Sequence, residues 1–311
     1  MRVWRPAPPA PSMVEGSAVE GPALAGKPAL GEAEGPPVPP HPLRAALVYL
    51  HGIQSHSRWY EASSRRLAES GVAVYQIERR GSGADAAHER GHVDRAETWL
   101  ADAEAAAERA RDETGVAGVH LLGVSWGGKL ALASAADRPD LYRSLVLASP
   151  GICPRVDLAL LTKVRVAKCL ALGRDRERFP IPLADPHLFT ENPERIRYIA
   201  EDPLSLREVT ARFLYESRRL DRMVRRAAGR MDVPIFLALA ERDRITDNPA
   251  TRALVAGLGA PRHRIVEYAG ATHTLEFEPD PEPFFRDLVA WIYEVEAAEH
   301  PSPPFGRERE G

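Results

Sequence analysis

The feature that most constrains the fold of this chain is a Gly-X-Ser-X-Gly pentapeptide at residues 123–127. An apolar run at 119–124 predicts a buried strand before it, and an alanine-rich run predicts a helix after it. A serine at the tip of such a tight turn has a strained backbone, and the flanking small residues let strand and helix approach closely. The turn would expose the hydroxyl of Ser125 beside helix N-terminal N–H groups, which can stabilise an oxyanion.

The pentapeptide alone is weak evidence, because glycine and serine are common and the same spacing occurs in ordinary turns before core helices. The preceding strand and the following helix are the context that a nucleophilic serine requires. We therefore interpret Ser125 as a nucleophile, and a plain glycine-rich turn is the alternative interpretation.

Strands and helices are predicted to alternate along most of the chain. Further apolar runs, which are typical of buried parallel strands, lie at 45–50, 72–77, 144–148, 234–240 and 264–268. Helical patterns separate most of them. This alternation predicts an α/β fold with a mostly parallel, doubly wound sheet and helices on both of its faces.

The alternation divides the chain into a core and three other segments. Residues 151–229 contain helical patterns and prolines but no convincing buried strand, so we expect a helical cap insertion there. The core then comprises residues 44–150 and 230–298. Residues 1–43 are rich in proline, alanine and glycine and predict a disordered arm, and residues 299–311 predict a C-terminal tail.

Composition argues against several classes of function. The 311 residues include 41 lysines and arginines and 44 aspartates and glutamates, so there is no basic excess for nucleic acid. No apolar run approaches the roughly 20 residues of a membrane span, and no signal peptide is recognisable, so we expect a cytoplasmic location. The two cysteines are too few for a disulfide framework. No metal or cofactor motif occurs, so we expect neither group.

Two later residues are candidates to activate the serine. A hydroxyl is a weak nucleophile near neutral pH and needs a base, usually a histidine that a carboxylate orients. Ser125, Asp243 and His273 each follow a predicted strand, and such positions meet at one edge of a parallel sheet. We expect His273 to accept the serine proton and Asp243 to hold the imidazole. A capping or salt-bridged Asp243 and an ordinary loop His273 are the alternatives, and Asp247 is a rival carboxylate that fits better before a helix start at 248–249.

An oxyanion would need two backbone N–H donors. One should come from Trp126, directly after the serine, and the other from the loop after the first predicted strand. Gly52 allows that loop to turn closely, so the N–H of Ile53 is our candidate for the second donor.

Taken together, these residues resemble the α/β-hydrolase superfamily, and within it the monoacylglycerol lipase and lysophospholipase-like group. The matching sequence pieces are H-G-I at 51–53, R-G-S-G at 80–83, G-V-S-W-G-G at 123–128, D-P-L at 202–204, E-R-D at 241–243 and G-A-T-H at 270–273. The resemblance covers about residues 44–298 and is more specific for the fold and the catalytic residues than for the substrate. Three departures are Ser82 where the family usually has histidine, Trp126 where methionine is common, and two N-terminal strands that are not recognisable in residues 1–43.

The resemblance implies a serine hydrolase that cleaves a small-molecule carboxylic ester, such as a monoacylglycerol or a lysophospholipid, through an acyl-enzyme on Ser125. The insertion would supply an apolar acyl pocket and gate access to it. An acyltransferase or thioesterase with the same triad, and a non-catalytic binding protein with this fold, are the alternatives. The basic helix faces of the insertion are interpreted as solvated surfaces or as a transient contact with a membrane surface. No protein partner is predicted.

Overall fold

The computed structural model describes residues 1–6 and 43–299. Most of the expected N-terminal arm and all but the first residue of the expected C-terminal tail lie outside these ranges. Within them, no helix is long and apolar enough to cross a membrane.

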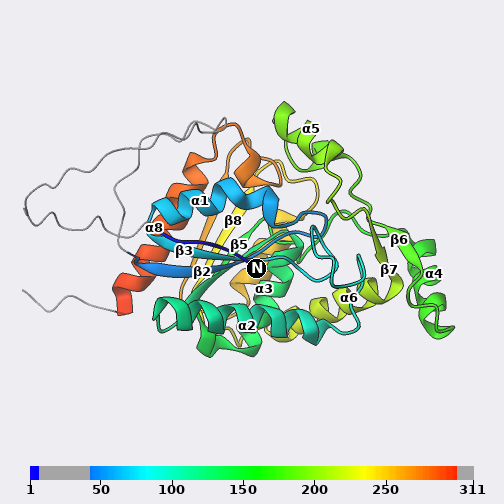
Figure 1. The fold of residues 1–311 in the computed structure, drawn as a ribbon, viewed down its shortest axis with the longest axis horizontal. Coiled ribbons are helices and arrows are strands. Elements are labelled where there is room, and N and C mark those ends of the chain that lie inside the picture. The colour runs from blue at the N-terminus through cyan, green and yellow to red at the C-terminus, as the bar shows by residue number, and fades with distance from the viewer. Residues whose placement is uncertain (7–42, 300–311) are drawn as a thin grey trace, which may run out of the picture.

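A seven-stranded sheet forms the centre of the molecule (Figure 1). Its strands follow the order β1-β3-β2-β4-β5-β8-β9, and every neighbouring pair is parallel except β1 with β3. The strands are β1 (Arg2–Trp4), β2 (Ala45–Leu50), β3 (Val72–Ile77), β4 (Val119–Val124), β5 (Tyr142–Ala148), β8 (Ile235–Ala240) and β9 (His263–Tyr268). The predicted mostly parallel sheet is therefore confirmed.

Strand β1 differs from the sequence prediction, which assigned residues 1–43 to an arm without regular structure. Residues 2–4 pair antiparallel with residues 74–76 of β3, and Val3 and Trp4 pack against the core. The prediction is wrong for these residues, because three residues are too few to show a hydrophobic period. Their pairing covers an edge of the sheet that would otherwise leave backbone groups unpaired.

Helices cover both faces of the sheet, as the doubly wound prediction requires. Helices α1 and α8 lie on one face, and α2 and α3 lie on the other (Figure 1). Their bounds are α1 (Glu61–Glu69), α2 (Ala96–Thr114), α3 (Trp126–Asp137), α7 (Asn248–Ala256) and α8 (Glu282–Glu299). Short 3-10 helices occur at η1 (Ser57–Tyr60), η2 (Pro139–Leu141), η3 (Pro186–Leu188) and η4 (Leu275–Phe277).

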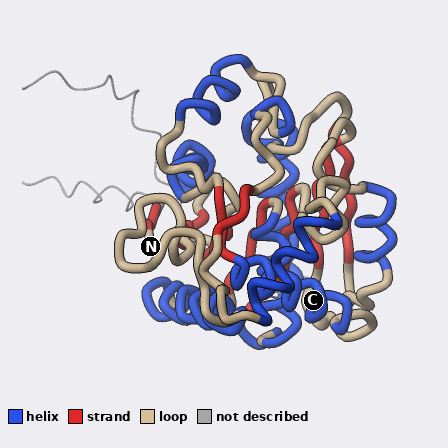
Figure 2. Tube along the Cα trace, turned by 90° about the vertical axis from the view of Figure 1, so that its right-hand side faces the viewer, coloured by secondary structure: helices blue, strands red, loops and turns tan. Residues whose placement is uncertain are grey.

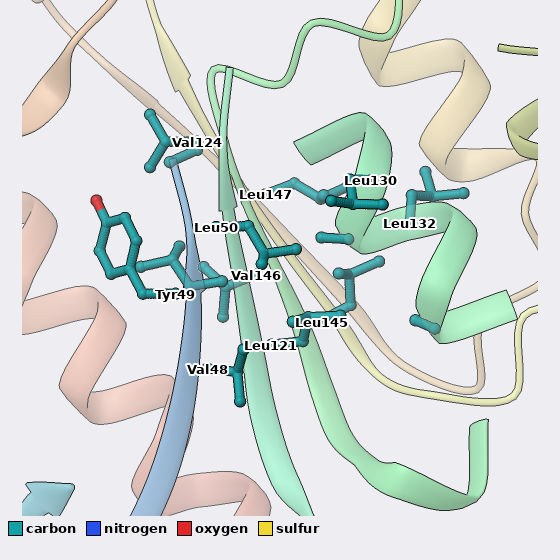
Figure 3. Packing of buried hydrophobic residues seen from close by; sticks show 14 of the residues in the cluster. Val48, Tyr49, Leu50, Leu121, Val124, Leu130, Leu132, Leu145, Val146 and Leu147 are labelled. Carbon is teal, nitrogen blue, oxygen red and sulfur yellow. The ribbon is translucent and has the colours of Figure 1, made fainter. Parts of the chain in front are cut away.

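The main core lies between the sheet and these helices. All six residues of β2, β4 and β8 are buried, which explains why apolar residues dominate these strands. Figure 3 shows side chains of β2, β4 and β5 beside Leu130 and Leu132 of α3. Burial of these large side chains stabilises the sheet edge at which β4 turns into α3.

The segment between β5 and β8 is the predicted helical insertion, here called the insertion (residues 151–229). It contains α4 (Leu160–Ala171), α5 (Pro193–Glu201) and α6 (Ala211–Arg226), and it also contains a small antiparallel pair of strands, β6 (Arg178–Pro180) and β7 (Glu208–Thr210). The sequence shows no convincing buried strand here, and these two strands have only three residues each and are partly exposed, so they leave no readable apolar run. Figure 2, which faces this side of the molecule, shows the insertion in front of the main sheet.

Candidate active site

The strand-to-helix turn predicted around Ser125 is present between β4 and α3. Ser125 has φ +53° and ψ −122°, a backbone conformation that side chains rarely adopt. A Cβ on Gly127 would lie 2.2 Å from the carbonyl oxygen of Leu50, and a Cβ on Gly123 would lie 2.5 Å from that of Gly127. Without a side chain, Gly127 lets α3 lie against the end of β2, and Gly123 lets β4 lie against the start of α3.

The three side chains predicted to act together form one chain of hydrogen-bonding contacts. His273 Nε2 lies 2.9 Å from Ser125 Oγ, and His273 Nδ1 lies 2.8 Å from Asp243 Oδ2. Ser125 is 8% exposed, Asp243 3% and His273 1%, so water has little access to the contacts. The residues follow β4, β8 and β9, whose carboxyl ends meet at one edge of the sheet.

Asp243 is held by the loop that follows β8. Its Oδ1 accepts the backbone N–H groups of Ile245 and Thr246 at 2.8 and 3.0 Å, and its Oδ2 accepts the Thr246 hydroxyl at 2.6 Å. Burial acts to raise the pKa of Asp243, but contacts with His273 and Thr246 outweigh burial and hold that pKa below its usual value. An ionised Asp243 accepts a hydrogen bond from the Nδ1–H group of His273, which leaves the lone pair of Nε2 facing Ser125.

The rival carboxylate, Asp247, lies outside this chain. It is the N-cap residue of α7, and its Oδ1 accepts the N–H of Ala250 at 2.9 Å. This capping contact satisfies a helix N–H that has no intrahelical partner. The expectation that Asp247 leads into the helix start is confirmed.

The residues expected to donate to an oxyanion lie on two sides of Ser125. Helix α3 begins at Trp126, so the N–H of Trp126 has no intrahelical acceptor. Ile53 follows β2, and it lines the same cavity as Ser125 and Trp126. A Cβ on Gly52 would lie 3.4 Å from Ser125 Cβ, so the loop of Ile53 passes directly beside the serine.

A cavity of about 340 Å³ opens beside Ser125, between the core and the insertion. Much of its wall is apolar and comes from the insertion, namely Val166, Ala167, Leu170, Ile181, Leu183 and Leu214. Charged residues line another part, namely Lys129, Asp157, Lys163, Arg218 and Asp221. The cavity is thus suited to a molecule with both an apolar chain and a polar group.

The insertion is joined to the core through Asp202. Its carboxylate oxygen Oδ2 lies 2.8 Å from His56 Nε2 and accepts the indole N–H of Trp59 at 2.7 Å. Burial acts to raise the pKa of Asp202, but the contacts with Trp59, Leu204 and His56 lower it on balance. An ionised Asp202 therefore anchors the insertion to the loop that also carries Ile53.

Glu276 is a buried carboxyl group three residues after His273. It accepts hydrogen bonds from Tyr49 Oη at 2.6 Å and from Ser63 Oγ at 2.8 Å. Burial raises the pKa of Glu276 from 4.5 to about 7, and the two hydroxyl donors offset only part of this rise. Glu276 therefore stays protonated to a higher pH in the folded protein than in the unfolded chain.

We expect the free energy of unfolding of the wild-type protein to fall, relative to Glu276→Gln, as pH rises from 4.5 to about 7. A group whose folded-state pKa exceeds its unfolded value stabilises the fold below the unfolded pKa, and this contribution is lost as pH rises through the folded pKa. The difference between the unfolded and folded pKa values corresponds to about 3 kcal/mol of stability. Urea denaturation of both proteins at pH 4.5 and pH 8 measures this loss of stability. An equal difference between the two proteins at both pH values would contradict the prediction.

Comparison with known proteins identifies the family. Residues 41–280 match the family model described as serine aminopeptidase, S33. The chain belongs to this family. It is 24% identical over 253 residues to the monoacylglycerol lipase of Mycolicibacterium smegmatis, a match that covers 80% of this chain and 88% of that protein. It is 27% identical over 264 residues to the human monoglyceride lipase, with 83% of this chain and 86% of that protein covered.

A solved structure agrees with the fold. The crystal structure of Paleococcus ferrophilus monoacylglycerol lipase superposes with a TM-score of 0.71 and 26% identity, and the match covers 82% of this chain and 96% of that one. This S33 family member therefore has the α/β-hydrolase fold. Together with the matches above, the fold makes the chain an ester-hydrolysing α/β hydrolase.

Proposed function

We propose that this chain cleaves carboxylic esters through an acyl-enzyme on Ser125. His273 Nε2 takes the proton of the serine hydroxyl as Oγ attacks the ester carbonyl, and Asp243 stabilises the imidazolium that forms. The N–H groups of Ile53 and Trp126 stabilise the oxyanion of the tetrahedral intermediate. His273 then gives its proton to the departing alcohol. A water molecule next attacks the acyl carbonyl while His273 takes its proton; the bond to Oγ breaks, the acid leaves, and His273 returns the proton to Oγ. The observation that carries this proposal is the unbroken contact from Asp243 through His273 to Ser125.

We propose a monoacylglycerol-like ester with one acyl chain as the substrate. The apolar wall that α4 and α6 contribute to the cavity suits such a chain, and relatives that align along most of their length are monoacylglycerol lipases. A volume of about 340 Å³ lies at the lower end of the range of small-ligand sites, which is about 300–1,000 Å³. This size favours one acyl chain over the three of a triacylglycerol.

The charged part of the cavity favours a second substrate class, the lysophospholipids. Three cations line it against two carboxylates. Lys129 Nζ lies 2.5 Å from Asp221, and an Arg218 guanidinium nitrogen lies 2.9 Å from Asp157. Lys163 lies 2.5 Å from that same Asp157. The excess of one positive charge would attract the phosphate of a lysophospholipid head group.

Labelling with a fluorophosphonate probe tests the proposed function, because the probe reacts only with an activated serine. A folded protein that is not labelled and releases no fatty acid would be a binding protein instead. A panel of monoacylglycerols and lysophospholipids with the same acyl chain then ranks the head groups by kcat/KM. Adding an alcohol acceptor, or offering a thioester, separates hydrolysis of oxygen esters from acyl transfer and thioester cleavage.

We propose that α4 makes a transient contact with a membrane surface. Leu160 is 76% exposed, Leu161 84% and Val164 59%, although all three are apolar. Lysines and arginines are interleaved with them along the helix, namely Lys163, Arg165 and Lys168. A helix with exposed apolar side chains among cations suits the interface of an anionic bilayer.

The double substitution Leu160→Asp and Leu161→Asp is expected to weaken binding to phosphatidylglycerol vesicles about 10-fold or more, since each buried leucine contributes about 1.5–3 kcal/mol. Vesicle sedimentation measures binding, and hydrolysis of a short-chain ester in solution should change less than about twofold. Leu43→Asp is the control, because Leu43 is exposed but lies outside the insertion. Equal vesicle binding by the double variant and the wild-type protein would contradict the proposed contact.

A further inference from the structure

Arg79 is a buried arginine that the reaction described above does not use. It lies two residues after β3 and is 4% exposed. Its guanidinium donates to the carbonyl oxygen of Gly52 at 3.0 Å, to that of Ile53 at 2.6 Å and to Ser82 Oγ at 2.7 Å. Burying a guanidinium is costly, and burial lowers the pKa of Arg79 from 12.5 to about 9. A guanidinium that is buried despite this free-energy cost is a candidate for a functional role.

Two of these contacts act on the loop of the expected oxyanion donor. The carbonyl of Gly52 and the N–H of Ile53 belong to one planar peptide group. A donor on that carbonyl therefore fixes the direction of the N–H and polarises it, which makes it a stronger donor to an oxyanion. The second contact, to the carbonyl of Ile53, holds the next peptide group of the loop.

His51 adds a second donor to the same carbonyl, and Arg79 determines its tautomer. The backbone N–H of Arg79 donates to His51 Nε2 at 3.1 Å, so the proton of the neutral imidazole lies on Nδ1. His51 Nδ1 in turn lies 2.8 Å from the carbonyl oxygen of Gly52. Burial, and next the charge of Arg79, lower the pKa of His51 well below its usual value, which keeps the ring neutral.

Arg79 also contacts the residue that carries the other expected donor. Its guanidinium lies over the indole ring of Trp126, 4.7 Å from the ring centroid, and 5.6 Å from the ring centroid of Phe213. The Trp126 ring packs edge-on against Trp99, with 4.9 Å between ring centroids. These contacts hold the Trp126 side chain at the start of α3. The Arg79 guanidinium thus contacts both residues that carry the expected oxyanion donors, Ile53 and Trp126.

We propose that Arg79 is a positioning residue for the oxyanion hole. It orients and polarises the Gly52–Ile53 peptide and braces Trp126, so that both N–H groups point at the oxygen that becomes negatively charged. Its contribution is larger in the transition state than in the ground state, because the oxyanion carries the charge. This inference rests on the proposed serine-hydrolase function.

The test compares Arg79→Met and Arg79→Lys with a matched arginine, Arg90. Arg90 also donates to backbone carbonyls, those of Gly83, Leu204 and Ser205, but none of these belongs to the oxyanion loop. Arg79→Met is expected to lower kcat about 10- to 100-fold with little change in KM, less than the about 10²–10³ that loss of a donor itself costs. Arg79→Lys should recover part of the rate, and Arg90→Met should change kcat less than about threefold.

A trifluoromethyl ketone with the acyl chain of the substrate supplies a second readout. Ser125 Oγ bonds to its carbonyl carbon, the serine proton passes to His273, and the carbonyl oxygen becomes an oxyanion. Fluorine NMR across pH gives the affinity and the pKa of this adduct. In Arg79→Met we expect the affinity to fall about 10-fold or more and the pKa of the hemiketal to rise, since both depend on the oxyanion donors. Thermal unfolding of each variant measures stability separately.

The outcomes separate this inference from the proposed function. If the wild-type protein forms no adduct and hydrolyses no ester, the proposed function is wrong. If the wild-type protein is active and Arg79→Met keeps its kcat and its adduct pKa, the positioning role is wrong. If Arg79→Met and Arg90→Met lose the same amount of stability and the same fraction of kcat, the positioning role is also wrong.

Discussion

Replacement of Ser125 with alanine is expected to lower ester hydrolysis by about 10⁴- to 10⁶-fold while the protein stays folded. The substitution removes the hydroxyl oxygen that lies 2.9 Å from His273 Nε2, on the side of the imidazole ring opposite Asp243. A β-carbon remains, so the packing around Gly52 is unchanged. Titration of the fatty acid released from a monoacylglycerol measures the rate, and thermal unfolding shows that the fold is intact.

Ser134→Ala is the matched control for this prediction. Ser134 is also a buried serine next to apolar residues of α3, and its hydroxyl pairs with Tyr142 Oη at 2.7 Å. Its loss should cost about 1 kcal/mol of stability and leave the rate within about twofold. Hydrolysis by Ser125→Ala at the rate of Ser134→Ala would show that Ser125 is not the nucleophile.

Asp243→Asn is expected to lower kcat by about 10⁴-fold. The carboxylate uses Oδ1 for two backbone N–H groups and Oδ2 for Thr246 and His273. If the asparagine oxygen keeps the backbone contacts, its NH₂ group faces His273 Nδ1. The imidazole must then present a lone pair at Nδ1 and carry its proton on Nε2, so it donates to Ser125 and cannot accept the serine proton.

The control for this change is Asp247→Asn. Asp247 caps α7, and asparagine is an equally good N-cap residue, so neither stability nor rate should change by more than about 0.5 kcal/mol or twofold. Steady-state kinetics across pH measure both variants. If the two variants lose activity to the same extent, Asp243 does not orient the histidine.

The fold was predictable because its central strands are buried on both faces. Such strands are mostly apolar: β2 and β8 are apolar throughout, and β4 is apolar except for His120. The helices between them follow from the parallel order. The positions of Ser125, Asp243 and His273 were predictable for a related reason. They follow β4, β8 and β9, parallel strands of one sheet, by about one, three and five residues, so the topology itself brings the three together.

Other parts depend on contacts that no local pattern encodes. Strand β1 forms by pairing with an edge of β3, and β6 and β7 form by pairing with each other. All three strands have only three residues each, too few for a readable pattern. Arg79 lies in a loop and reads as an ordinary surface arginine, since arginine is rarely buried. Its one sequence signal was its place directly after a buried strand, and its partner Gly52 lies 27 residues away. The charged part of the cavity likewise arises only where α4 and α6 of the insertion meet α3.

Mass spectrometry of the protein during turnover tests the central proposal most directly. An activated ester such as a p-nitrophenyl ester is mixed with the wild-type protein, the reaction is stopped in acid within the first turnovers, and the peptides are mapped. We expect one acyl group, carried by the hydroxyl of Ser125. Continued ester hydrolysis with no acyl group on any residue, or with the acyl group on a different residue, would contradict the proposed acyl-enzyme.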